Sequence, residues 1–306
     1  MKWHGGISFF LMGAMALGAA AQAPARPAIT GIAFMRLYTT DSAAAQKFYG
    51  PTMGFERREV DGTWVYPVNH SQWIEVLPNT PPPTPNGRMA AIAFTTVDAA
   101  GLERYLNAKG VATTQPLHDG EFGVRDPEGN LVIFVQHNAK AGVVRMVAEA
   151  KPSPDATSRR IIHVGFIVHD PAKEDPFWRE ILGFRPYWHG TMHAGRTDWV
   201  SQQVPDGTDW LEYMLHINDP PSLHDSGMQD HFSLGVERMQ TVLAALQRNG
   251  CEGKQCTAIQ AGADGKIQLN LFDPDQTRVE YMEFTPAMKP CCSEFTGKHP
   301  GPNDDK

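Results

Sequence analysis

Four stretches of the sequence open in the same way, and this repetition limits the fold more than any other feature. Each stretch begins with an apolar strand, near Phe34, Ala91, His163 and His231, and continues through a helical pattern to a glycine. The repeat of about 55 to 65 residues is typical of a duplicated structural unit. Each unit reads as strand, helix and three further strands, and one unit cannot cover its own sheet face. We therefore predict an α+β fold in which four β-α-β-β-β units form two domains.

The first 21 residues have the pattern of a secretory signal. Lys2 provides the positive start, residues 7–17 form an apolar run too short to span a bilayer comfortably, and residues 19–21 are all alanine. We expect an exported protein, periplasmic or secreted, that has no membrane attachment after cleavage at residue 21. A retained membrane anchor is the alternative.

Composition divides the rest of the chain into two domains. Residues 29–138 are predicted as the first domain, the polar and proline-containing residues 139–158 as a linker, and residues 159–286 as the second domain. Residues 287–306, rich in proline, glycine and charge, are predicted as an irregular tail. The net charge of −7 and the lack of a basic run argue against nucleic acid or an anionic membrane as partner.

The four cysteines predict one or two disulfides if the protein is exported. Cys251 and Cys256 can close a small loop, whereas the neighbours Cys291 and Cys292 are expected to be strained as a pair. Their connectivity stays open. A zinc site built from these four residues is disfavoured by their irregular spacing.

Several motifs resemble the vicinal oxygen chelate superfamily, which includes glyoxalase I, extradiol dioxygenases and bleomycin-resistance proteins. They are the strand His163-Val164-Gly165-Phe166, the Leu182-Gly183-Phe184 that follows the helix, and the segment from Asp273-Pro274 to Val279-Glu280. The resemblance extends from about Thr30 to Phe284. It implies paired units that form a cupped sheet around a metal ion.

The resemblance also implies that the first and last strands of each unit supply the metal ligands. In the second domain these positions are His163 and Glu212 in the third unit, and His231 and Glu280 in the fourth. Both pairs are 49 residues apart, as a site with twofold pseudosymmetry requires. Imidazole and carboxylate ligands suit a divalent ion such as Zn, Ni, Co, Mn or Fe. We therefore expect one such ion, with open positions for a small substrate that offers two adjacent oxygens.

The first domain lacks most of this set. Its equivalent positions are Phe34, Glu75, Ala91 and Ile133, so only one carboxylate remains. We predict a domain without a metal site, which is structural or forms a wall of the pocket. Glu75 is interpreted as an ordinary strand residue.

The reaction is open between three interpretations. The main prediction is a lyase or isomerase that resembles glyoxalase I, in which Glu212 or Glu280 moves a proton. The four-unit layout also resembles type I extradiol dioxygenases, which bind Fe(II) through two His and one Glu, here His163, His231 and Glu280. Glu212 stands where those enzymes have a catalytic His, and Asn270 where they have a Tyr. The third interpretation is a protein that binds a small molecule or antibiotic without catalysis.

Further side chains are candidates for substrate contacts. Arg196 and Arg278 are candidates for holding an anionic group, and Trp199 and Trp210 for lining an apolar pocket, with surface or core placement as the default. The expected partner is a small molecule. A homodimer is left open, because such units pair in the same way within and between chains.

Overall fold

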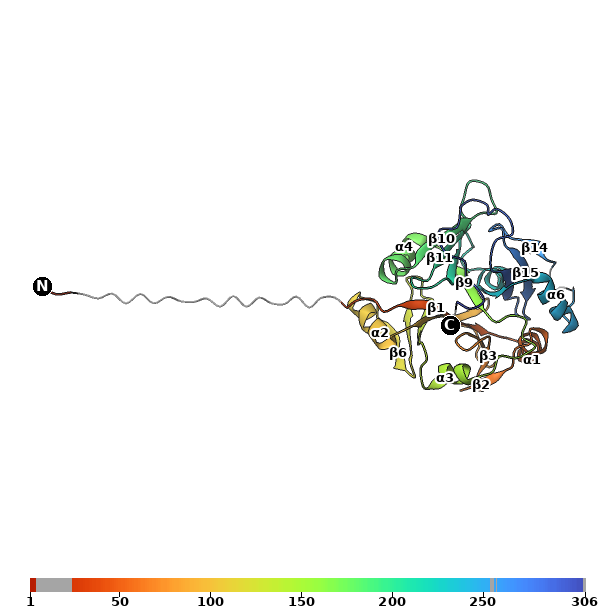
Figure 1. The fold of residues 1–306 in the computed structure, drawn as a ribbon, viewed down its shortest axis with the longest axis horizontal. Coiled ribbons are helices and arrows are strands. Elements are labelled where there is room, and N and C mark those ends of the chain that lie inside the picture. The colour runs from red at the N-terminus through yellow and green to blue at the C-terminus, as the bar shows by residue number, and fades with distance from the viewer. Residues whose placement is uncertain (4–23, 254–255, 257, 305–306) are drawn as a thin grey trace.

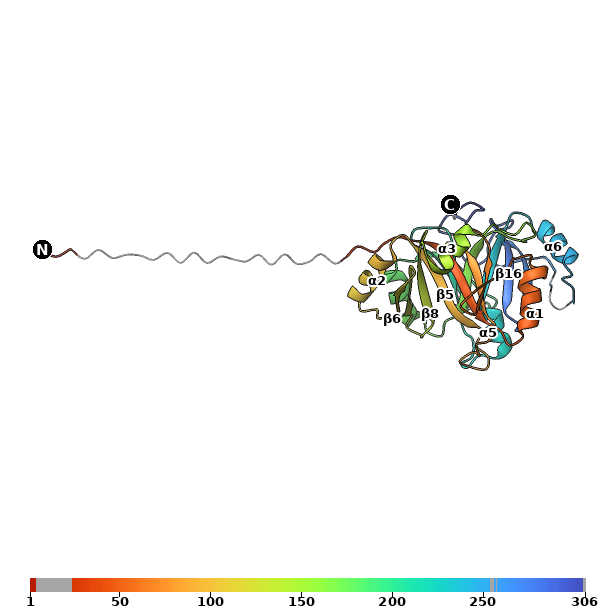
Figure 2. The ribbon, with the colours of Figure 1, turned by 90° about the horizontal axis from the view of Figure 1, so that it is seen from below.

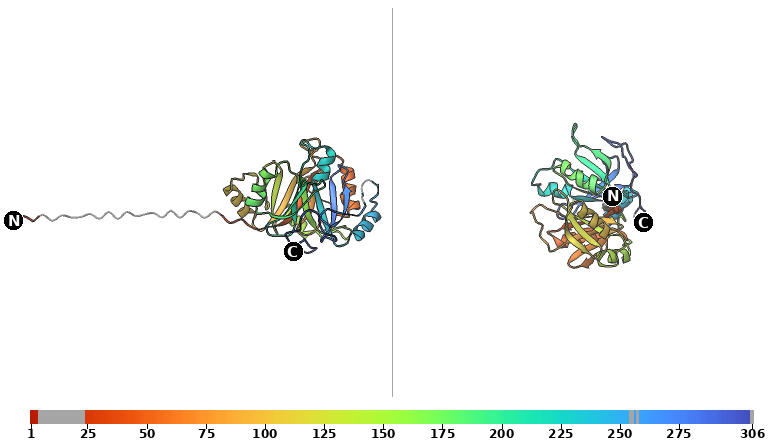
Figure 3. Two further views of the ribbon diagram at one scale, coloured as in Figure 1. Left: turned by 90° about the horizontal axis from the view of Figure 1, so that it is seen from above. Right: turned by 90° about the vertical axis from the view of Figure 1, so that its left-hand side faces the viewer.

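A computed structural model describes residues 1–3, 24–253, 256 and 258–304, and within them the chain forms two eight-stranded sheets. In Figure 1 the first sheet lies in the lower lobe, coloured red to yellow-green, and the second in the upper lobe, coloured green to blue. The right-hand view of Figure 3 shows the same two lobes one above the other. The strands of the first sheet are β1 (Ile29–Tyr38), β2 (Arg58–Val60), β3 (Thr63–Pro67), β4 (Trp73–Leu77), β5 (Met89–Thr96), β6 (Thr113–His118), β7 (Glu121–Arg125) and β8 (Leu131–Gln136). Those of the second are β9 (Ile161–Ile167), β10 (Arg185–Gly190), β11 (Trp199–Gln203), β12 (Trp210–Met214), β13 (His231–Val236), β14 (Gln260–Ala261), β15 (Ile267–Phe272) and β16 (Arg278–Glu283).

The two sheets have the same topology. The orders are β2-β3-β4-β1-β5-β8-β7-β6 and β10-β11-β12-β9-β13-β16-β15-β14. In each unit the first strand is parallel to the last, and the first strands of the two units pair antiparallel at the sheet centre. This arrangement confirms the prediction of four β-α-β-β-β units in an α+β fold.

Helices follow the first strand of every unit. Aspartates accept backbone hydrogen bonds at the starts of three of them, which satisfies amide groups that have no partner inside a helix. The helices are α1 (Ser42–Lys47) with the π-helical turn η1 (Phe48–Thr52), α2 (Ala99–Ala108), α4 (Pro171–Asp175) with the π-helical turn η2 (Pro176–Ile181), and α6 (Met239–Arg248). The helical segment after β9 is therefore α-helical only in its first part.

One apolar cluster runs through both halves of the molecule. It contains side chains from α1, η1, α2, η2 and α6 and from one face of both sheets, so the halves share a core. The opposite, cupped face of each sheet is covered separately. In the first half it is covered by α3 (Gly142–Glu149), whose Val144 and Val147 belong to the same apolar cluster as Phe34 and Ala91. Figure 2 shows α3 lying across the strands of this sheet.

Two turns, one in each half, accept hydrogen bonds from the other half. The Asp275 carboxylate accepts hydrogen bonds from Thr39 Oγ1 at 2.6 Å and from the Thr40 amide at 3.1 Å. In the opposite direction, Glu128 accepts from the amides of His169 at 3.0 Å and Asp170 at 2.6 Å. Each acceptor is the third residue of an Asp-Pro turn in one half, and each donor segment leads into the first helix of the other half.

The segments between and after the sheets contain more structure than the sequence predicted. The predicted linker, residues 139–158, contains α3, and the connector before His231 contains α5 (Leu223–Gln229). The tail is irregular over residues 287–304, yet it packs on the second sheet. The predicted signal segment lies outside the described residues except for residues 1–3, so it stays a prediction. Among the described helices, none combines the length and apolar character needed to cross a membrane.

Both cysteine pairs are joined. Cys251 pairs with Cys256, as the small loop between them allows. Cys291 pairs with its neighbour Cys292, and these two pairs settle the connectivity that the sequence left open. The Cys292 backbone lies in the left-handed region, with φ of 72°, and this conformation accompanies the approach of the two side chains.

Candidate metal centre

The four predicted ligands lie on neighbouring strands at the centre of the second sheet. His163 lies in β9, which pairs antiparallel with β13 and parallel with β12. His231 is the first residue of β13 and lies opposite Gly165. Glu212 in β12 also registers with Gly165, and Glu280 in β16 registers with the strand that begins at His231. The equal spacing in the two units therefore places all four side chains at the middle of one sheet.

Three of the four come together closely. His163, His231 and Glu280 are buried, and each offers a ligand atom within 4.8 Å of the others. The Nε2 atoms of the two imidazoles are 3.0 Å apart, and His163 Nε2 is 3.3 Å from Glu280 Oε2. Two imidazole nitrogens and one carboxylate oxygen that converge in this way fit a divalent ion and leave positions open for other ligands.

The orientation of His231 is fixed by its surroundings. Its Nδ1 donates a hydrogen bond to the Gln229 carbonyl oxygen at 2.8 Å, so the lone pair remains on Nε2, which faces the centre. The ring lies directly over Gly165. A Cβ atom at position 165 would lie 2.0 Å from His231 Cε1, so this strand position accepts only glycine without displacing the ring.

Glu212 lies at the edge of this group. Its Oε1 accepts a hydrogen bond from Ser201 Oγ at 2.9 Å, and its Oε2 is 4.0 Å from His231 Nε2. The structure thus gathers a triad of two histidines and one glutamate, with Glu212 beside it. Whether Glu212 is a fourth ligand stays a prediction.

Burial and charge set the protonation of the group. Burial, together with Arg278 and His163, holds the pKa of His231 well below its usual value, so its ring is neutral at pH 7 and keeps a lone pair for a metal. Burial raises the pKa of Glu212, and the nearby Glu280 carboxylate adds to this effect. Burial alone would also raise the pKa of Glu280, but Arg278 and His163 outweigh it and lower the pKa. The two carboxylates therefore have pKa values shifted in opposite directions, as in a site with one ligand and one proton acceptor.

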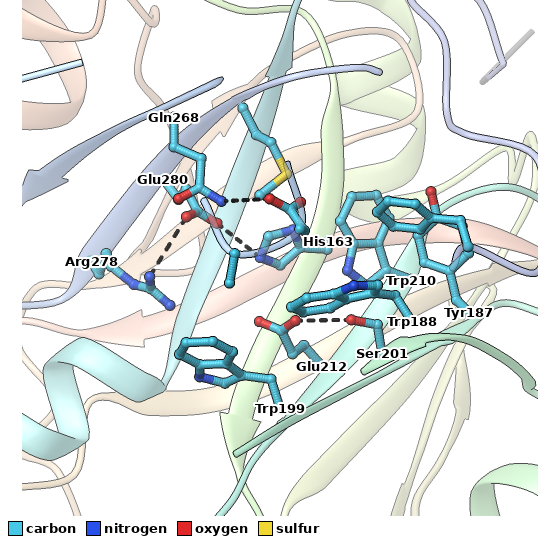
Figure 4. Close-up of a pocket in the computed structure, with 14 residues that line it drawn as sticks. His163, Tyr187, Trp188, Trp199, Ser201, Trp210, Glu212, Gln268, Arg278 and Glu280 are labelled. Atoms are coloured by element: carbon cyan, nitrogen blue, oxygen red, sulfur yellow. Dashed lines mark hydrogen bonds and ion pairs between the residues drawn. The ribbon is translucent and has the colours of Figure 1, made fainter. Parts of the chain in front are cut away.

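A cavity of ≈ 80 Å³ opens next to this group. Figure 4 shows Trp188 and Trp210 on one side of Glu212 and His163, and Trp199 and Arg278 on the other. The lining residues all come from the second half of the chain. They include Phe295 of the tail, so the tail closes part of the cup.

Hydrogen bonds hold this part of the tail in place. The Trp188 indole N–H donates to the Cys291 carbonyl at 3.2 Å, and Gln203 donates to the Lys298 carbonyl at 2.7 Å. The Phe295 ring centroid lies 4.8 Å from that of Tyr187. The tail is therefore a wall of the cavity. From the sequence, the first domain was the candidate for this wall.

The first half is different at each equivalent position. Phe34, Ala91 and Ile133 belong to the apolar cluster under α3. Glu75 is buried and accepts hydrogen bonds from Trp73 and Arg36, so it is paired within its own half. The helix and this ion pair occupy the face that forms the cup in the second half.

Sequence comparison establishes the family. The profile of the Glyoxalase/Bleomycin resistance protein/Dioxygenase superfamily matches residues 31–134 and 160–281, so the chain belongs to this superfamily. This confirms the resemblance inferred from the motifs. No curated protein sequence matches the chain.

Extradiol dioxygenases are among the solved structures that resemble the chain. Homoprotocatechuate 2,3-dioxygenase from Brevibacterium fuscum, solved in an anaerobic complex with 3,4-dihydroxyphenylacetate, is 18% identical with a TM-score of 0.61; the match covers 92% of this chain and 85% of that one. The enzyme of the same name from Arthrobacter globiformis is 18% identical with a TM-score of 0.58, over 94% and 87% of the two chains. At this identity the likeness concerns the fold. These comparisons leave the main prediction of a glyoxalase I-like enzyme unconfirmed.

The sequence analysis did not predict several residues of the site. Ser201 holds Glu212, and Lys266 is fully buried with its Nζ 4.5 Å from the Trp210 ring centroid. Gly165 had a readable signal, because a glycine inside a strand often marks the close approach of another group. Phe295 had none, because no local pattern links a proline- and glycine-rich tail to a sheet.

Proposed function

We propose that the protein is a metal-dependent ring-cleaving dioxygenase of the extradiol kind, with Fe(II) held by His163, His231 and Glu280. The observation that carries this proposal is the buried triad, whose ligand atoms lie within 4.8 Å of one another. Two histidines and one carboxylate on one face of an ion, with open positions opposite, are typical of non-haem Fe(II) oxygenases. The likeness in fold to extradiol dioxygenases supports the same reading.

The chain's own residues fit the needs of such a reaction. Bound Fe(II) would supply a chelation site for the two hydroxyls of a catechol and a place for dioxygen to react. Glu212 lines the cavity beside the triad, and Ser201 holds its Oε1, so Oε2 is the atom placed to accept a proton from a substrate hydroxyl. Trp188 and Trp199 supply apolar walls that restrict water around the reacting ring.

A lyase or isomerase of the glyoxalase kind is the second candidate. Glu212 stands where the extradiol pattern has a histidine, and Asn270, next to Glu280 in the sheet, stands where that pattern has a tyrosine. A second carboxylate beside the triad suits proton transfer between adjacent carbons. In this reading Glu212 is both the fourth ligand and the base.

Oxygen uptake separates the two candidates. Protein loaded anaerobically with Fe(II) would be mixed with catechols and oxygen, while oxygen consumption and the absorbance of ring-opened product are recorded. Extradiol cleavage places both oxygen atoms in the product, so one O₂ should disappear for each ring opened. His163→Ala should abolish uptake, while His189→Ala, at an exposed position in β10, should leave it intact.

Other outcomes have distinct meanings. Metal binding without oxygen uptake, combined with solvent-deuterium exchange into a hydroxyketone or ketoaldehyde, would support the lyase or isomerase. Failure to bind any divalent ion would remove both enzyme proposals and leave a non-catalytic binding protein.

A further inference from the structure

Lys266 is a cation in the interior of the second half. It directly precedes β15 and is fully buried. Lysine is almost never fully buried without partners, because its ammonium group loses its hydration there. Burial lowers the pKa of Lys266 to about 8, and Asp264 and Glu280 oppose this shift, so the ammonium form prevails at pH 7. Among the described residues, this lysine belongs neither to the ligand triad nor to the lining of the cavity, so its presence has another reason.

The ammonium group lies between one carbonyl group and two aromatic rings. Its Nζ donates a hydrogen bond to the Phe284 carbonyl oxygen at 3.0 Å. It also lies 4.5 Å from the centroid of the Trp210 ring and 5.7 Å from that of the Phe295 ring. A cation is attracted to an aromatic face within about 6 Å, most strongly to tryptophan and where water is excluded. Lys266 therefore holds Trp210 in place from within the core.

Trp210 in turn packs on His163. The two residues are register partners on the parallel strands β12 and β9, so their side chains leave the same face of the sheet side by side. Their ring centroids are 4.7 Å apart and their planes are 33° from parallel (Figure 4). A continuous row of contacts therefore leads from the Lys266 ammonium group through the indole ring to a residue of the triad.

The two histidines of the triad are held in different ways. His231 donates from Nδ1 to the Gln229 carbonyl oxygen, and this bond fixes its ring. The Nδ1 atom of His163 is buried and has no hydrogen-bond partner among the described residues. A histidine that binds a metal almost always has an acceptor for its second ring N–H, and this acceptor sets the direction of the ring. For His163 the packed Trp210 ring takes this role, because the imidazole cannot turn without disturbing the contact.

The first half keeps the aromatic pair but lacks the lysine. Phe34 and Trp73 are register partners in the same way, with ring centroids 4.9 Å apart and planes 32° from parallel. The position seven residues before the Asp-Pro turn is Lys266 in the second half and Asp119, which is exposed, in the first. The sheet and the aromatic pair thus form without a buried cation at this position. The lysine occurs in the half that has the histidines.

We propose that Lys266 is a positioning residue of the metal centre, which holds Trp210 against His163 and thereby fixes the direction of the His163 Nε2 atom. The inference rests on the proposed metal site and adds to it a residue that touches neither the metal nor the substrate. Because Phe295 contacts the same ammonium group, the tail is attached to the same point.

The test measures metal binding, so that no substrate is needed. Zinc affinity would be measured at pH 7 by competition with a chromogenic chelator, and the visible d–d absorption of bound Co(II) would report the arrangement of the ligands. Lys266→Met keeps the length of the side chain and removes its charge. We expect this variant to bind zinc about 10- to 100-fold more weakly and to change the Co(II) spectrum. Lys266→Arg keeps the charge and should restore part of both.

Further variants connect the effect to the indole ring. Trp210→Phe keeps a ring with a weaker attraction to the cation and should lower zinc affinity about 2- to 10-fold, and it provides the test if Lys266→Met does not fold. In a Trp210→Leu background, Lys266→Met should cause little further loss of zinc affinity. Lys109→Met is the matched control, because Lys109 lies 5.6 Å from the Tyr105 ring centroid in the first half, and it should bind zinc like wild type. Circular dichroism and thermal melting check that each variant is folded.

Three outcomes would overturn the inference. If folded Lys266→Met matches wild type in zinc affinity and Co(II) spectrum, the lysine does not position the ligand, although the metal site stands. If Lys266→Met costs the same affinity with and without Trp210, the lysine acts by a route other than the indole ring. If the wild-type protein binds neither zinc nor cobalt, the proposed metal site and this inference fail together.

Discussion

Replacing Gly165 by alanine should disable the metal site without touching a ligand. The new Cβ would lie 2.0 Å from Cε1, 2.5 Å from Nδ1 and 2.9 Å from Nε2 of His231. Carbon atoms in contact are normally about 3.5–4.0 Å apart, so the ring has to move by about 1.5 Å or more. Its hydrogen bond to the Gln229 carbonyl, now 2.8 Å long, would break in the process.

A shift of that size is far outside what a metal ligand tolerates. Metal–imidazole distances lie near 2.0–2.1 Å and vary by only about 0.2 Å in working sites. We therefore expect the affinity for zinc to fall about 100-fold or more, the upper end of what loss of an orienting contact costs. Crowding at the strand should also lower the free energy of unfolding by about 1–3 kcal/mol.

Zinc affinity would be measured by competition with a chromogenic chelator, and folding by circular dichroism and thermal melting. Gly50→Ala is the control, because a Cβ there meets no atom nearer than 4.0 Å. His231→Ala and the double variant complete a double-mutant cycle. Once the His231 ring has been removed, Gly165→Ala should cause little further loss of zinc affinity. A folded Gly165→Ala protein that binds zinc like wild type would show that His231 is not a ligand.

Three further predictions concern stability. Burial and the neighbouring Asp126 carboxylate raise the pKa of Glu174 to about 8, so the folded state holds this proton more tightly than the unfolded chain. The free energy of unfolding should therefore fall as the pH rises from about 4.5 to about 8, and Glu174→Gln should flatten this decline in urea titrations at several pH values. Asp275→Ala removes the carboxylate that accepts hydrogen bonds from Thr39 and Thr40, and it should lower the free energy of unfolding by about 1.5–3 kcal/mol. In the same titrations the control Asp155→Ala, at an exposed position, should change the free energy of unfolding by less than about 0.5 kcal/mol. Val147→Asp should bury a carboxylate under the first sheet and lower the melting temperature by about 10 °C or more, and an unchanged melting temperature would mean that α3 is not required there.

The fold was predictable because each unit carries its own local signals. The strand at His163, the helix from Ala99 to Ala108 and the turn at Asp273-Pro274 are each readable from periodicity and turn chemistry. The equal spacing from His163 to Glu212 and from His231 to Glu280 also places these four side chains in one region. Such features depend on residues close in the sequence or on comparison with another copy of the repeated unit.

Other features depend on contacts that no local pattern encodes. From the sequence, the alanine- and valine-containing segment of α3 is interpreted as a linker, because nothing near it in the sequence shows that it covers the first sheet. Likewise, Phe295 becomes a wall of the cavity only because the tail folds back over the second sheet. The preference for three close ligands over four rests on the hydrogen bond from Ser201 to Glu212, which is a matter of side-chain conformation.

The exchange of turns between the halves also affects how the protein can be made. The eight strands of the first half end at Gln136, but the carboxylate that receives Thr39 and Thr40 is Asp275. A ribosome adds about 5–20 residues per second, so the roughly 140 residues between them take about 7–30 s. During that interval the apolar face of the first half has only part of its partner, because the shared core also contains side chains near residues 269–281. The nascent chain is then most exposed to aggregation, and a chaperone that holds this face would act before residue 275 has emerged.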